Sequence, residues 1–198
     1  MARKLRIEYP GAVYHVMSRG NQGSPIFQGD GDRRLFLETV AEGCEKTGWR
    51  IHAYVLMPNH YHLLLETPEG NLVAGMKWLQ GTYTQRYNGR PQVLGHLFQG
   101  RYKALIVDGG AEEYFRVVST YIHLNPARAG LIRIGEEALS RYPWSSYPNY
   151  VRRRAVRPPW LEVRRVLGSA GIGTDDARGR RGYEAYVEGR VLELGRRQ

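Results

Sequence analysis

The chain has 198 residues, 42% of them hydrophobic, which is enough for one packed domain with an appendage. Its single cysteine excludes an internal disulfide, and no apolar run approaches the ~20 residues of a membrane-spanning helix. The 29 Lys and Arg against 19 Asp and Glu give a net charge of +10, which favours a polyanionic partner. The basic N-terminus lacks the apolar block of a signal peptide, so we expect a cytoplasmic protein without membrane contact.

Alternating side chains predict a first strand over residues 11–18, and a turn-rich loop follows it at 19–23. The next apolar residues recur at helical spacing and therefore predict a helix; they are Phe36, Val40 and Cys44. Gly48 is a suitable stop for this helix, because glycine readily adopts the left-handed conformation that ends many helices.

Residues 50–57 and 60–66 predict two strands, and the tight turn Pro58-Asn59 between them makes the pair a hairpin. Asn71 is a candidate N-cap for a second helix. The apolar stripe of that helix recurs every three or four residues and comprises Leu72, Met76, Leu79, Tyr83 and Tyr87.

A fourth strand is expected within residues 97–108, ended by Gly109-Gly110. A third helix then begins near Ala111 and runs to about Leu124, since Pro126 disfavours helical geometry in the residue before it. The order strand, helix, strand, strand, helix, strand predicts an α+β fold. It is a ferredoxin-like, four-stranded antiparallel sheet with helices packed on it, in which the first and third strands are central neighbours.

The pattern weakens beyond Leu131. Residues 142–147 predict a coil that packs aromatic side chains back on the domain, and residues 152–159 predict a basic linker. Two short helices are expected in a C-terminal tail, at 161–167 and 183–194.

The histidines of the second hairpin strand are the first candidates for chemistry. Side chains alternate along a strand, so His60 and His62 point to the same face and form half of a metal site. His15 on the neighbouring strand is expected near them, in a structural role rather than as a ligand; the same role is expected for His123.

The third helix carries the second set of candidates. Tyr121 and Asn125 are four residues apart, so on a continuous helix they lie one above the other. An amide oxygen is an acceptable ligand for a hard cation, and a tyrosine beside such an ion is a candidate nucleophile. Whether Asn125 keeps helical geometry directly before Pro126 is left open by the sequence.

His60-x-His62 followed by Tyr121-Ile122-x-x-Asn125-Pro126 resembles the HUH-type single-tyrosine transposases. The segments 14–21, 95–103 and 144–147 also resemble the branch called REP-associated tyrosine transposases. The resemblance covers roughly residues 5 to 148. It divides the chain into a catalytic domain of this type at residues 1–150 and a basic, helical tail at 151–198.

The resemblance implies a DNA-cleaving and strand-joining enzyme. Mg²⁺ or Mn²⁺ would be held by His60, His62 and Asn125, and Tyr121 would form a 5′-phosphotyrosine link with single-stranded, hairpin-flanked DNA. Side chains nominated as DNA contacts are Arg19, Asn21, Arg86, Arg101, Lys103 and Arg128. The sequence does not decide between a monomer and a homodimer.

Two other readings remain open at this point. The same basic sheet would also suit a module that holds hairpin DNA or RNA without cutting it, and such binding would be indifferent to chelator. A metal-dependent phosphodiesterase that uses water in place of Tyr121 would leave no covalent intermediate.

Overall fold

The computed structural model describes residues 6–89, 95–107, 112–152 and 157–196. Four antiparallel strands form one sheet in the order β2-β3-β1-β4. Their bounds are Ala12–Arg19 for β1, Arg50–Met57 for β2, His60–Thr67 for β3 and Lys103–Val107 for β4. The predicted ferredoxin-like arrangement is confirmed, with β1 and β3 in the middle of the sheet.

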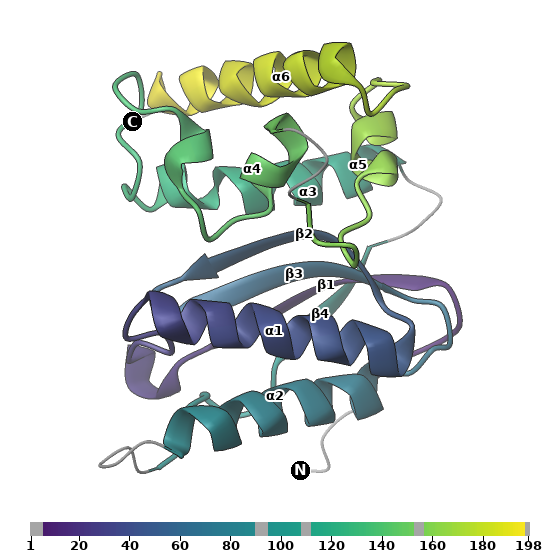
Figure 1. Ribbon diagram of the computed structural model, residues 1–198, viewed down its shortest axis with the longest axis vertical. Coiled ribbons are helices and arrows are strands. Elements are labelled where there is room, and N and C mark those ends of the chain that lie inside the picture. Colours follow the sequence, from purple (N-terminus) through teal and green to yellow (C-terminus); the bar gives the residue numbers. More distant parts are fainter. Residues whose placement is uncertain (1–5, 90–94, 108–111, 153–156, 197–198) are drawn as a thin grey trace.

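Two long helices, α1 (Asp30–Thr47) and α2 (Leu72–Asn88), cover one face of the sheet (Figure 1). Gly48 ends α1 with φ +71°, as its sequence position predicted. Asn71 occupies the N-cap position of α2, but its side chain does not cap the helix. Its amide instead accepts a hydrogen bond from Trp49 Nε1 and donates one to the Thr47 carbonyl, which fixes the start of β2 against α2.

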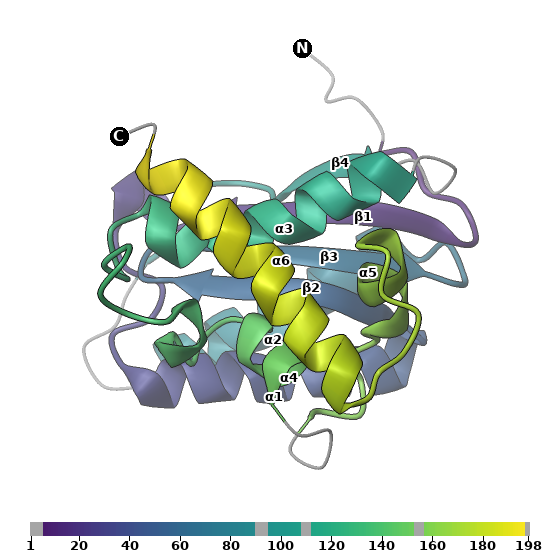
Figure 2. The same cartoon turned by 90° about the horizontal axis from the view of Figure 1, so that it is seen from above.

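The opposite face of the sheet carries the remaining helices (Figure 1). These are α3 (Glu112–Arg128), α4 (Tyr147–Val151), α5 (Arg164–Ser169) and α6 (Ala177–Gly195), while two single 3₁₀ turns, η1 (Asn21–Gly23) and η2 (Leu139–Arg141), lie in loops. Seen from above, α6 crosses over α3 and α4, so it forms a layer outside α3 (Figure 2). No helix in the described ranges combines the length and apolar character needed to cross a membrane.

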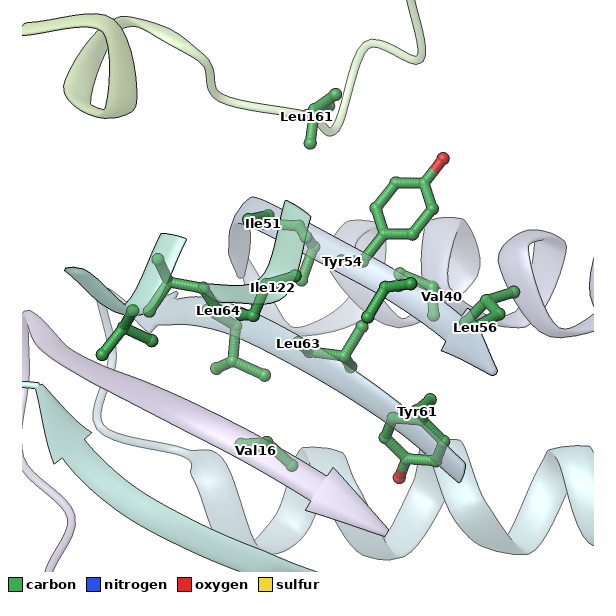
Figure 3. Close-up of a cluster of buried hydrophobic side chains, with 14 of the residues drawn as sticks. Val16, Val40, Ile51, Tyr54, Leu56, Tyr61, Leu63, Leu64, Ile122 and Leu161 are labelled. Atoms are coloured by element: carbon green, nitrogen blue, oxygen red, sulfur yellow. The ribbon is translucent and has the colours of Figure 1, made fainter. Parts of the chain in front are cut away.

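The core lies on both sides of the sheet because successive residues of β3 face opposite layers (Figure 3). Tyr61 points toward α1 and α2, where its ring packs 4.7 Å from Phe36 and its hydroxyl accepts a hydrogen bond from Gln80. Leu64 lies on the α3 side, with Ile122 of α3. Apart from Gln80, the side chains named here are fully buried, and burial of a large apolar side chain contributes about 1.5–3 kcal/mol to folding.

Three details of the sequence-based prediction were wrong. Helix α3 does not end near Leu124 but continues through Pro126 to Arg128. The tail helix begins at Ala177, earlier than predicted, where Asp176 accepts hydrogen bonds from the amides of Arg178 and Gly179. The first tail helix, predicted at 161–167, begins three residues later and occupies Arg164–Ser169. The predicted break at Gly109-Gly110 and the linker residues 153–156 lie outside the described residues.

Later segments of the chain cover the outer edge of β2. The amide of Leu56 donates to the Trp144 carbonyl, and the amide of Ser146 donates to the Tyr54 carbonyl. Further along the same edge, the amide of Glu162 donates to the Ile51 carbonyl. The segment from Trp144 to Ser146 is therefore anchored on the sheet, as the sequence predicted.

Candidate active site

The two histidines of β3 face the α3 side of the sheet, as the strand alternation predicted. The centroids of the His60 and His62 rings lie 5.1 Å apart. His60, the first residue of β3, is half-buried, and His62 is buried. His60 Nδ1 donates to Asn59 Oδ1 at 2.8 Å, so Asn59 in the hairpin turn sets the orientation of that ring.

His15 lies directly beside the pair, as β1 and β3 are neighbours. Its Nε2 forms a hydrogen bond of 2.8 Å with His62 Nδ1. The contact occupies Nδ1 of His62 and leaves its Nε2 for another partner, because an imidazole has only two ring nitrogens. His15 therefore orients His62 and fits the structural role predicted for it.

Tyr121 approaches the histidines from α3. Its ring centroid lies 5.7 Å from that of His62 and 6.1 Å from that of His15. The side chain is 38% exposed, so it is reachable from solvent. Together with His60 and His62 it lines a cavity of about 480 Å³. Residues from the sheet and from a helix some 60 positions later thus converge on one cleft.

Asn125 lies one helical turn beyond Tyr121, on the same side of α3. Because α3 runs unbroken through Pro126, the stacking that the sequence left open is present. The Asn125 side chain is buried and forms a hydrogen bond with His60. An amide, two imidazoles and a phenol therefore share this part of the sheet surface.

Cationic side chains surround the cleft. Arg19, Arg101 and Lys103 line the same cavity as Tyr121, and the Arg128 guanidinium carbon lies 5.4 Å from the Tyr121 ring centroid. Asn21 lines a neighbouring hollow with His96 and Leu97. Gln99 also lines the cleft and was not nominated, although it lies in the segment 95–103 that resembles the REP-associated branch.

Arg86 does not join these cations. It lies on α2, which covers the opposite face of the sheet, and its guanidinium makes two hydrogen bonds of 2.8 and 2.9 Å with the Glu42 carboxylate. We therefore leave Arg86 out of the candidate site.

The comparison with protein families identifies the chain. A model of the family described as "Transposase IS200 like" matches residues 9–125, a span that runs from β1 to Asn125. This chain belongs to the IS200-like transposase family. Transposases cut DNA and transfer its strands, so DNA is the substrate of the family to which this cleft belongs.

A solved structure supports the fold assignment. It is described as the structure of the REP-associated tyrosine transposase bound to a REP hairpin and matches 82% of this chain and 92% of its own, with a TM-score of 0.64 and 18% sequence identity. A Deinococcus radiodurans R1 protein, provisionally described as a transposase, matches 59% of this chain and 94% of its own, at TM-score 0.43 and 20% identity. A search of curated proteins found no match.

In this IS200-like transposase, burial lowers the pKa of His15, His60 and His62 and so favours their unprotonated form at neutral pH. It lowers the pKa of His15 to about 4, and it lowers the pKa of His62 to about 3 with a smaller effect of the neighbouring His15. The pKa of His60 is also lowered, by burial and then by the charge of Arg19, against the opposing hydrogen bond with Asn125. The ring nitrogens that face the cleft thus keep their lone pairs.

The donor set fits a hard divalent cation with open coordination positions. Two rings that share an ion through metal–nitrogen bonds of about 2.1 Å have centroids roughly 5 Å apart, and those of His60 and His62 are 5.1 Å apart. Within the described ranges, no three His, Cys, Asp or Glu residues are grouped so that they would hold a metal. A cation here would therefore depend on the Asn125 amide and on oxygen atoms of water or substrate.

Proposed function

We propose that this IS200-like transposase cleaves and rejoins single-stranded DNA through a covalent 5′-phosphotyrosine link at Tyr121. The observation that carries the proposal is that Tyr121, His60 and His62 line one cleft together with cationic side chains. The buried Asn125 lies beside His60 at this cleft. All of these residues come from a single chain, so one copy supplies the whole set.

The chemistry assigned to the chain is a transesterification, in which a phosphodiester bond to Tyr121 forms as the phosphodiester bond within the DNA strand breaks. The Tyr121 hydroxyl attacks phosphorus and loses its proton, and the bond from phosphorus to the 3′ oxygen breaks. The leaving 3′ oxygen takes up a proton and remains as a free hydroxyl, while the 5′ phosphate stays on Tyr121. Attack by the 3′-hydroxyl of a second strand then reverses the step and releases the tyrosine.

Each neighbouring residue has a definite task in this scheme. Arg19, Arg101 and Lys103 would hold backbone phosphates along the cleft, since a cationic groove follows a nucleic-acid backbone. His60, His62 and Asn125 would hold a divalent ion, Mg²⁺ or Mn²⁺. When bound, that ion supplies positive charge beside the phosphate oxygens on which negative charge accumulates.

Single-stranded DNA with a neighbouring hairpin is the proposed substrate. Tyr121 is anchored on a helix that packs against the sheet, and it reaches only a phosphate that has left the regular duplex. A hairpin beside the cleavage point is proposed because the REP-associated tyrosine transposase of similar fold is described as bound to a REP hairpin.

A covalent-trapping experiment tests the proposal. Labelled single-stranded hairpin DNA is incubated with the protein and Mn²⁺, and the adduct is measured after denaturation. We expect an adduct that chelator prevents and that Tyr121→Phe abolishes. Tyr114→Phe is the matched control, because Tyr114 is exposed on the same helix but outside the cleft.

An adduct that survives in Tyr121→Phe would refute the assignment. Salt-sensitive DNA binding without any adduct, unaffected by chelator, would instead support a binding module on the same fold.

A further inference from the structure

The C-terminal helix α6 contacts α3 at two points that flank Tyr121 in sequence. The hydroxyl of Tyr186 lies 3.2 Å from Thr120 Oγ1, and the hydroxyl of Tyr183 lies 2.9 Å from His123 Nδ1. The two α3 residues are three positions apart, and so are the two α6 residues, so on each helix the contacting side chains lie on one face. The contacts lie where α6 crosses α3 (Figure 2).

The second of these contacts continues into the sheet. His123 is fully buried, and its Nε2 lies 2.8 Å from Ser146 Oγ. Ser146 Oγ donates to the Tyr54 carbonyl and accepts from the Tyr54 amide, both on β2. One assignment satisfies every group: Tyr183 donates to His123, His123 donates to Ser146, and Ser146 donates to Tyr54. A buried chain of hydrogen bonds thus connects the tail, through α3, to the sheet.

These contacts hold the side of α3 that faces away from the cleft. At about 100° per residue, Thr120 and His123 lie on one side of the helix, whereas Tyr121 and Asn125 lie roughly 150° around from them. The phenol oxygen of a tyrosine lies roughly 8 Å from its helix axis, so a rotation of about 7° displaces it by about 1 Å. A misplacement of about 1 Å is enough to cost about 100-fold in rate.

We propose that α6 is a positioning element for the nucleophile. The hydroxyls of Tyr183 and Tyr186 fix the rotation of α3, and this rotation aims Tyr121 and Asn125 at the histidines of β3. The inference rests on the proposed function of Tyr121, and it makes the tail part of the catalytic unit. Tyr183 and Tyr186 act through α3 and do not touch the cleft histidines.

Paired hydroxyl deletions test this role while every aromatic ring stays in place. The test variant is Tyr183→Phe with Tyr186→Phe. The control is Tyr147→Phe, whose hydroxyl lies 3.5 Å from Glu188 and therefore joins α4, not α3, to the tail. The unfolding midpoint of each variant is recorded first, so that kinetics are compared only at temperatures where all are folded.

Three measurements then separate positioning from general stability. We expect the double variant to form the Tyr121 adduct at least 10-fold more slowly at saturating DNA and to bind Mn²⁺ more weakly, because Asn125 moves with α3. Its affinity for hairpin DNA in chelator should stay within twofold of the parent. Tyr147→Phe should match the parent in all three. An unchanged adduct rate in the double variant, or an equal loss in Tyr147→Phe, would overturn the proposal.

Hydrogen exchange distinguishes a failure of this inference from a failure of the proposed function. The double variant should exchange amides of α3 faster than the parent, whether or not an adduct forms, and Tyr147→Phe should not. If the parent forms no adduct but this difference is present, the support of α3 by α6 stands and the catalytic assignment of Tyr121 fails. Equal exchange in all three proteins would refute the support itself.

Discussion

Acidification should destabilise this protein, and the buried His123 should cause a measurable part of the loss in unfolding free energy. Burial lowers the pKa of His123 to about 3, whereas an unfolded histidine has a pKa of about 6.5. Between these values the unfolded chain binds a proton that the folded chain does not bind, so stability is lost as the pH falls. From pH 7 to pH 5 the loss assigned to His123 is about 2 kcal/mol.

His15 and His62 shift in the same direction, so the parent protein should lose more than this amount. The contribution of His123 is isolated by comparing the parent with His123→Gln in urea unfolding at pH 7, 6 and 5. Chelator is present so that no divalent ion stabilises the cleft. We expect the variant to be less stable at pH 7, yet its unfolding free energy should fall by about 2 kcal/mol less between pH 7 and 5.

Tyr150→Phe is the control for this comparison, since the Tyr150 ring packs 4.9 Å from that of His123 and the variant removes no histidine. Its pH dependence should parallel that of the parent. Parallel curves for His123→Gln and the parent would refute the reasoning, because His123 would then not be held neutral by folding.

Three further predictions concern stability. Gly75→Ala should lower the unfolding free energy by about 1–3 kcal/mol, because a Cβ there would lie 2.1 Å from the Trp49 ring. Gly81→Ala on the same helix is the control: its Cβ meets nothing within 4 Å, so it should raise the unfolding free energy by about 0.5–1 kcal/mol. Urea unfolding measures both changes. Arg157→Ala should cost about 3 kcal/mol and expose the tail to protease, as it removes one partner of a nearly buried ion pair with Asp175 at 2.6 Å. Asp176→Ala should cost about 1 kcal/mol and speed hydrogen exchange in the first turn of α6, since two amides lose their acceptor.

Features with a local period could be predicted from the sequence. Strand alternation placed His60 and His62 on one face, and the strand order placed His15 beside them. The apolar stripe of α2 was also correct in every member. These features depend on spacing of two or of three to four residues, which a sequence displays directly.

Features that depend on distant partners could not be predicted. Pro126 ends a helix by local rules, but the neighbouring Leu124 and Ala127 are buried, and packing keeps the turn helical. Arg86 was nominated for DNA, yet its partner Glu42 lies 44 positions earlier on another helix. The hydrogen bond between His123 and Tyr183 spans 60 positions and has no periodic pattern.

The covered edge of β2 limits how two copies of this protein are able to associate. An open sheet offers two borders to which another molecule's strand adds, and filament growth requires both. On one border, segments that follow α3 already occupy backbone groups of β2. The other border is the five-residue β4, whose Lys103 also lines the cleft. Among the described strands, addition from a second molecule is therefore confined to the β4 border, which lies next to the cleft where we propose that DNA binds.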